Sequence, residues 1–260
     1  MIKQNALTDK LESIISVGGI VGRNVDKGLI DYCQKSNFIS YSHSQTHSNN
    51  ENGWSYNGAV VWSGQCNLGG IVGSNAARVR GCFATGTMNL EANHYCYIGA
   101  VAGQNLNGGS IQVSYARNAT VTARNTINND FTYRAGAFIG TNSGICSYCY
   151  TADVLVKALE CLDGNNRLAG FAAGNSGTFN NCFAVSTLEG FDNNVTSAFT
   201  FDNGIINNCY YNIQTQGDVE GFFDNTPIVT LQSEAFLNSL SFAMMGYHYQ
   251  PNDFPIIIYN

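Results

Sequence analysis

Two short motifs in this chain have the residue types and spacing of metal or redox sites. His43 and His47 are four residues apart, and Cys146 and Cys149 have the CxxC spacing of zinc and thiol-redox centres. The histidines lie in a Ser/Asn-rich segment without a helical pattern, so they are not expected to share a helix face. No second CxxC pair accompanies the cysteines to complete a four-ligand zinc site. The sequence therefore predicts no bound metal and no cofactor.

Carboxylates are the second chemistry to consider, because polysaccharide-degrading enzymes use two or more acids that converge on one face. The candidates are Asp153, Asp163, Glu189, Asp192 and Asp202. They fall at different phases of the repeat described below, and no pair recurs at a spacing of one repeat. We therefore expect a non-enzymatic protein, with a polysaccharide-degrading lyase or glycosidase as the alternative.

A dense aromatic group offers a surface for ligand binding. Trp54, Tyr56 and Trp62 follow a polar run at residues 42–53 that predicts one protruding loop. Aromatic side chains stack on sugar rings and anchor protein interfaces, so these three are the predicted ligand-binding residues. The alternative is that they pack the loop onto neighbouring elements, because large aromatic side chains are mostly buried.

A sequence repeat defines the elements that must position these residues. A glycine-rich apolar segment ending in Asn occurs six times, with successive asparagines 28 to 51 residues apart. The asparagines are Asn24, Asn75, Asn105, Asn142, Asn175 and Asn203. Constant motifs separated by variable spacers are typical of a solenoid, in which a fixed core carries variable surface loops.

A second unit follows each glycine-rich segment and centres on a small thiol or hydroxyl residue. The position is occupied by Cys33, Cys82, Ser114, Cys149, Cys182 and Cys209. Because a serine substitutes in one repeat, the position does not require a disulfide, and we predict that the four cysteines after Cys33 are buried and unpaired. Cys66, Cys96 and Cys161 lie in the spacers, and the sequence leaves their pairing open.

Short apolar segments bounded by Gly and Asn, with β-branched and aromatic residues, predict strands. Each repeat offers three of them: the glycine-rich segment, the Cys-aromatic segment, and a third such as residues 119–123. We therefore predict an all-β fold, a three-sided parallel β-helix of about six coils.

Aligned repeat positions then acquire structural roles. The six asparagines should form a structural ladder of amides where a strand turns, with a row of sugar-binding amides as the alternative. The third motif position should point into the core, and it holds Ile20, Ile71, Val101, Phe138, Phe171 and Phe199. Gly22, Gly73, Gly103 and Gly140 share a position that Ala173 fills in the fifth coil, so we expect it to require smallness more than a positive φ.

The repeat stops near residue 216, which predicts two regions: repeats over 1–216 and a capping segment over 217–260. Residues 230–240 have the pattern of a short amphipathic helix, and residues 254–259 that of a final strand. We expect this tail to cover an open end of the β-helix, because such ends expose backbone and apolar side chains.

The composition excludes some partners. The net charge is −6 and charged residues make up only 12%, without a cluster of Lys and Arg, so nucleic acid is not an expected partner. The sequence contains no apolar run of membrane-spanning length, so we expect no membrane insertion. The first residues contain no secretion signal, which is therefore absent or was left out of this chain.

The core at 69–75, Gly-Gly-Ile-Val-Gly-Ser-Asn, followed by Cys-Phe-Ala-Thr-Gly at 82–86, resembles the GLUG motif repeat. The likeness extends from about residue 17 to 213. It implies a bacterial cell-surface or secreted protein, extracellular in location, whose repeats accompany other domains of a larger parent chain. The implied role is adhesion to a host glycan or host surface protein, or spacing between domains. The resemblance supplies no catalytic residue.

Overall fold

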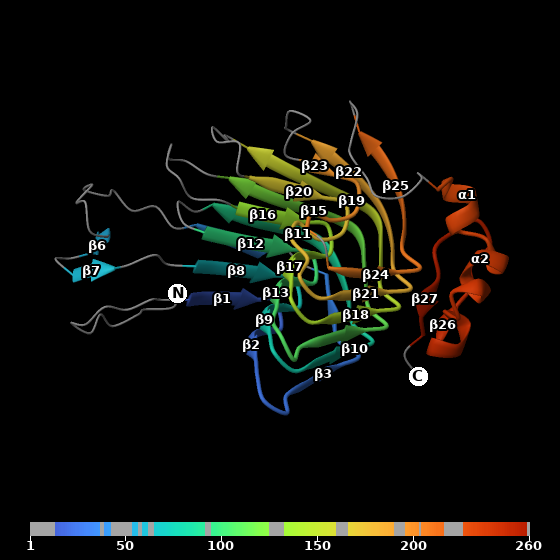
Figure 1. Cartoon of the computed structure of the whole chain (residues 1–260), viewed down its shortest axis with the longest axis horizontal. Helices are drawn as coiled ribbons and strands as arrows, with labels where there is room; N and C mark the ends of the chain where they lie inside the picture. The colour runs from blue at the N-terminus through green and yellow to red at the C-terminus, as the bar shows by residue number, and fades with distance from the viewer. Residues whose placement is uncertain are drawn as a thin grey trace.

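Each turn of the chain is built from short strands separated by sharp corners. The computed structural model describes residues 14–36, 39–42, 54–56, 59–61, 65–91, 95–124, 133–159, 166–189, 196–202, 204–215 and 226–258. In one turn, β8 (Gln65–Gly69) leads to β9 (Val72–Asn75), then β10 (Arg78–Arg80) and β11 (Phe83–Glu91). Equivalent strands of successive turns pair in parallel, so each turn stacks on the one before it (Figure 1).

Four parallel sheets, here numbered I to IV in chain order, result from this stacking. Sheet I contains β1 (Ile14–Gly18), β8, β12 (Tyr95–Gly99), β16 (Tyr133–Gly136), β20 (Arg167–Ala169) and β23 (Thr196–Ser197). Sheet II contains β2 (Val21–Asn24), β9, β13 (Ala102–Asn105) and β17 (Ile139–Asn142). Sheet III contains β3 (Leu29–Asp31), β10, β14 (Ser110–Gln112), β18 (Ile145–Ser147), β21 (Thr178–Asn180) and β24 (Ile205–Asn207).

Sheet IV is the longest wall of the solenoid. It contains β4 (Gln34–Lys35), β11, β15 (Tyr115–Arg124), β19 (Tyr150–Leu159), β22 (Phe183–Glu189) and β25 (Tyr210–Thr215), and β5 (Ile39–Ser42) also pairs with β11. The register of its strands shifts after Ala84 and after Thr151. Asn118 and Asp153 have positive φ near these shifts, so the long strands bend without ending.

The predicted parallel β-helix is confirmed, but a complete turn has four strands where three sides were predicted. The glycine-rich motif is not one strand, because it spans the corner between sheets I and II at Gly70 and Ile71. The Cys-aromatic segment spans the corner between sheets III and IV, and the predicted third strand continues the aromatic one. All four strands occur in four turns, whereas isolated bridges such as Ile139 to Ala172 replace sheet II in the last two.

The motif position of Gly22, Gly73, Gly103 and Gly140 lies where sheet II contacts sheet I, and its small residues let the two sheets approach closely. A Cβ added to Gly73 would lie 2.6 Å from the backbone nitrogen of Val17, and one on Gly103 would lie 2.6 Å from that of Leu68. Neither glycine has a positive φ. Smallness is therefore the requirement at this position, as predicted.

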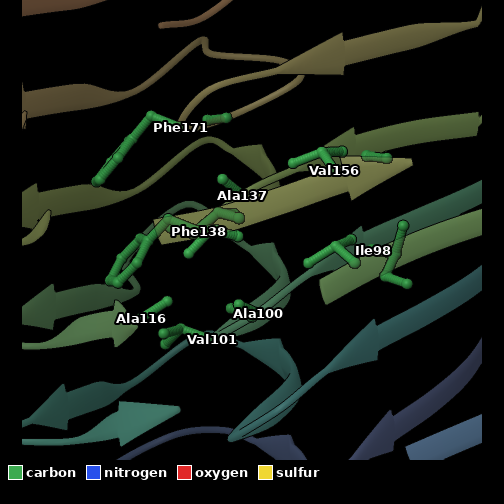
Figure 2. Packing of buried hydrophobic residues seen from close by; sticks show 14 of the residues in the cluster. Ile98, Ala100, Val101, Ala116, Ala137, Phe138, Val156 and Phe171 are labelled. Carbon is green, nitrogen blue, oxygen red and sulfur yellow. The ribbon is translucent and has the colours of Figure 1, made fainter. Parts of the chain in front are cut away.

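The core lies between the sheets and is continuous along the stack. The third motif position is fully buried from Ile71 onward, and the rings of Phe138, Phe171 and Phe199 stack with centroids 4.8 Å apart (Figure 2). The predicted apolar ladder is confirmed for these turns. Ile20, its member in the first turn, is 44% exposed, because no earlier described turn covers it.

The C-terminal segment folds as α1 (Ile228–Leu231), α2 (Glu234–Ser239), a 3-10 turn (Ala243–Met245), β26 (Tyr247–His248) and β27 (Ile256–Ile257). The single helix predicted over 230–240 is divided because Ser233 begins a new helix by accepting a hydrogen bond from the Phe236 amide. No helix among the described residues is long and apolar enough to span a membrane.

The C-terminal segment lies against the side of the solenoid and not over its end, contrary to the prediction (Figure 1). Its apolar residues, including Leu237, Phe242 and Phe254, pack with outward-facing rings of several turns. Phe242 contacts both Tyr150 and Phe183, which belong to successive turns. The segment therefore covers the apolar flank of sheet IV, because this flank offers more apolar surface than a single terminal turn.

Candidate ligand-binding face

The predicted aromatic binding group lies on a hairpin outside the four sheets. β6 (Trp54–Tyr56) pairs in antiparallel fashion with β7 (Ala59–Val61), so Trp54 and Tyr56 share one strand. Trp62 lies outside the described residues. The structure therefore brings two of the three candidates onto one short element, and their role as ligand-binding residues stays a prediction.

The asparagine position forms a buried ladder. Each side-chain amide donates from Nδ2 to Oδ1 of the next turn, with distances of 2.9, 2.8, 2.8 and 2.9 Å from Asn24 to Asn175. All five of these asparagines are buried, and Asn203 lies outside the described residues. The amides bond to one another and to backbone of the turn, as Asn75 does to the Ala77 carbonyl, so they are not presented to a ligand.

The thiol position holds the corner between sheets III and IV. The residue before each thiol or hydroxyl has a positive φ of 50 to 64°. The Cys or Ser side chain then donates to the carbonyl two residues earlier, at 3.2 Å for Cys82 and 2.8 Å for Ser114. The same side chain accepts from the next turn, since the Cys82 amide donates to Ser114 Oγ at 3.2 Å. A small side chain with one donor and one acceptor is thus required, which explains why Ser replaces Cys.

The described cysteines are all free. Cys82, Cys149, Cys182 and Cys209 are buried and unpaired, as predicted. Burial raises the pKa of Cys82 to about 12, so its thiol is protonated at neutral pH. Cys66 and Cys96, whose pairing was open, face each other in register as free thiols, and Cys161 lies outside the described residues.

The other chemical candidates lie apart. His43, His47, Asp163 and Asp192 lie outside the described residues. Glu189 pairs with Lys157 at 2.8 Å on sheet IV, whereas Asp202 lies beside sheet I. Asp153 is four residues from Lys157 along β19, so the Cα atoms of the two residues are about 13 Å apart. Within the described part of the chain, no three His, Cys, Asp or Glu side chains are grouped as metal ligands.

A polar column runs along the outer side of sheet I. Val17, Leu68 and Ile98 face the core, so the residues before them face outward. These neighbours continue in register from turn to turn. We call the column the polar strip, and its members are Ser16, Asn67, Tyr97, Arg134 and Arg167.

The first part of the polar strip is an amide and hydroxyl network shared with sheet II. Asn67 Nδ2 donates to Ser74 Oγ at 2.7 Å, and Ser74 is 2.9 Å from Ser16 Oγ. Gln65 Nε2 donates to Asn67 Oδ1 at 2.8 Å and to Gln104 Oε1 at 2.9 Å. Asn67 and Ser74 are buried, so this network joins sheets I and II to each other.

The last part of the polar strip is cationic. Arg167 Nη1 donates to Asp202 Oδ1 at 2.6 Å, and Arg134 Nη1 lies 3.9 Å from Asp202 Oδ2. The guanidinium carbon of Arg134 is 5.7 Å from the centre of the Tyr97 ring, and that of Arg167 is 5.2 Å from the centre of the Phe201 ring. Two guanidinium groups thus share one carboxylate, and each lies against an aromatic ring.

The sequence interpretation did not identify the polar strip. Its signal is present two residues before the first glycine of each motif, in the pattern of a variable residue, an apolar residue, and Gly or Ala. Aligning the copies at that offset places Tyr97, Arg134 and Arg167 in one column. These residues precede the first glycine of the motif and therefore lie outside the repeat unit as the sequence defines it.

Comparison with known families agrees with the fold. The model of the GLUG motif matches residues 64–89, which form the turn of β8, β9, β10 and β11. No curated protein and no solved structure matches the chain. The chain therefore carries the GLUG motif, and the resemblance drawn from its sequence is confirmed at that turn.

Proposed function

We propose that this chain is a non-enzymatic repeat module of a bacterial cell-surface or secreted protein, and that it acts in adhesion. The polar strip carries the proposal, because its last three turns present the partly exposed side chains of Tyr97, Arg134 and Arg167 at one outward position. The partner is a host glycan or a host surface protein, and a larger parent chain supplies other domains.

A repeated outward position suits an extended partner. Successive strands of a parallel sheet lie about 4.8 Å apart, so Tyr97, Arg134 and Arg167 span about 10 Å. An extended ligand that lies along the solenoid axis meets a new side chain at every turn. The guanidinium groups of Arg134 and Arg167 provide the directional contacts that orient a polar ligand.

A spacer is the second form of the same proposal, and it requires no ligand. The polysaccharide-degrading alternative has less support, because Glu189 and Asp202 are each paired with a cation on different faces. In the described part of the chain Asp202 is the one acid beside the strip and no second acid converges with it, which favours binding without turnover.

The test is a binding screen run beside a turnover assay. The purified chain is applied to a glycan array and to a panel of host surface proteins, and the same polysaccharides are incubated with it and assayed for new reducing ends and unsaturated products. We expect binding without products. Product formation would support the enzyme alternative, and the absence of any binding partner would leave the spacer role.

Two variants locate the binding face in the same screen. Tyr97→Ala alters the polar strip, and Trp54→Ala alters the predicted aromatic group on β6. If the strip binds, Tyr97→Ala weakens binding and Trp54→Ala leaves it unchanged. The reverse result would assign adhesion to the hairpin of β6 and β7.

A further inference from the structure

We propose that Arg134 and Arg167 form a binding site for the carboxylate groups of an acidic saccharide, with Tyr97 beside them. This inference rests on the adhesive role proposed above and specifies its ligand. The two arginines are neighbours in register on β16 and β20, so their guanidinium groups emerge from the same face one turn apart.

Charge is the first argument. Among the described residues a single carboxylate, Asp202, faces both guanidinium groups, so these three side chains carry one net positive charge on a chain whose net charge is −6. Arg134 lies beyond hydrogen-bond distance of Asp202, at 3.9 Å, and it donates no hydrogen bond to the described residues. A guanidinium has five N–H donors, so the pair retains donors for a second anion.

Preorganisation is the second argument. The rings of Tyr97 and Phe201 support the two guanidinium planes, and the side chains of Arg134 and Arg167 are only 30% and 33% exposed. Gly174 provides the necessary space, because a Cβ added there would lie 2.5 Å from Arg134 Nη1. Side chains already fixed in position lose less conformational entropy on binding, and partial burial strengthens their interaction with an anion.

The ligand class follows from the groups present. Arginine binds planar carboxylates through two parallel hydrogen bonds, and the Asp202 carboxylate already lies between the pair. Tyr97, on the turn before Arg134, is also partly exposed and adds a ring that can lie against a sugar. Gln104, which is partly exposed on sheet II, adds a neutral amide. Cationic and neutral polar groups on one face match a polymer of uronic acids, which carries carboxylates and hydroxyls.

Structural stabilisation does not account for the cluster equally well. The Asp202 side chain is 38% exposed, and ion pairs at such exposure contribute little to stability. Replacing the Asp202 carboxylate by a ligand carboxylate therefore costs the fold little free energy. The arrangement of two supported cations around one exposed anion is better explained by reversible binding.

Calorimetric titration of the whole chain with trigalacturonate tests the inference. We expect binding that weakens at least about tenfold in the double variant R134Q/R167Q. The matched control is R78Q/R80Q, which removes the same charge from two exposed arginines on sheet III and should bind as the unaltered chain does. Circular dichroism must show that both variants melt within about 2 °C of the unaltered chain. Equal loss in both double variants, or no loss in R134Q/R167Q, would overturn the site.

Three further probes test the ligand class. Neutral galactotriose should bind at least about tenfold more weakly than trigalacturonate. Tighter binding of sulfated galactotriose, or equal binding of hexaglutamate, would overturn the assignment to carboxylate saccharides. If the array yields neutral glycan or protein partners that bind R134Q/R167Q normally, this inference fails and adhesion stands. If nothing binds, adhesion fails as well.

Discussion

Two flanks of the solenoid use their outward columns of side chains in opposite ways. On sheet IV the column of Phe83, Tyr115, Tyr150 and Phe183 forms a stack of rings 4.8 to 5.0 Å apart. The chain covers this stack with its own C-terminal segment. On sheet I the outward column is the polar strip, in which sheet II covers Asn67 whereas Tyr97, Arg134 and Arg167 stay partly exposed. Both flanks are parallel sheets of the same solenoid, and their outward side chains decide which flank holds the fold together and which is available to a partner.

The ring stack on sheet IV is not suited to sugar binding even without its cover. Its rings lie nearly parallel, with interplanar angles of 3 to 7°, so their faces contact one another. Stacking on a sugar requires an open ring face. The aromatic residues of this flank therefore belong to the structure, and the sheet I flank is the better surface for recognition.

The largest effect is expected from Phe183→Ala. Phe183 is fully buried, stacks on Tyr150 at 4.8 Å, and contacts Phe242 and Phe254 of the C-terminal segment. Removing the ring should lower the free energy of unfolding by about 3–5 kcal/mol, through lost burial and a residual cavity. Urea denaturation measures the change. A loss below about 1 kcal/mol would mean that the C-terminal segment contributes little to the fold.

The next effect concerns the asparagine ladder. Asn105→Ala removes the acceptor of Asn75 and the donor to Asn142, which leaves polar groups of both buried side chains unpaired. We expect a loss of about 2–4 kcal/mol in the free energy of unfolding. Asn207→Ala is the control, because its bond to Asn180 Oδ1 is exposed and should contribute less than about 0.5 kcal/mol. Equal effects would contradict the difference between inner and outer rows.

A smaller effect is expected from pH. Lys35 Nζ contacts the Thr85 and Thr87 carbonyls, and burial lowers its pKa from 10.5 to about 8. Between pH 8 and 10.5 the unfolded chain binds more protons at this lysine, so its contribution to stability should rise with pH. We expect a gain of about 1 kcal/mol by pH 10, allowing for solvent screening in the outermost turn.

The control for this pH effect is Lys35→Met, which removes the titrating group. Urea denaturation at pH 7.5 and pH 10 gives the free energy of unfolding of both proteins. The difference between them should change with pH in favour of the unaltered chain. A constant difference would show that the amine is fully solvated.

The sequence was sufficient for the repeat, the parallel β-helix and the inward position of Phe138, because these depend on side-chain size and alternation within one motif. It was not sufficient for the corner at Gly70 and Ile71. A tight corner and a continuous strand have the same small apolar residues, and only the stacking of neighbouring turns separates them.

The faces were harder to predict than the core. The flank position of the C-terminal segment depends on contacts between Phe242 and rings that lie about 60 and 90 residues earlier, which no local pattern encodes. The cation pair of the polar strip escaped notice because Arg134 and Arg167 are separated by a full turn. Sites built between turns become visible only once the register is known.

The most direct test of the difference between the flanks compares Tyr97→Ala with Tyr150→Ala by thermal unfolding, with and without saturating trigalacturonate. Tyr97→Ala should melt within about 2 °C of the unaltered chain and lose most of the stabilisation by the ligand. Tyr150→Ala should melt about 8 °C lower or more and keep that stabilisation. The contrary result, in which Tyr97→Ala destabilises the fold as Tyr150→Ala does or retains the full ligand-induced shift, would contradict the assignment of binding to sheet I and of structural support to sheet IV.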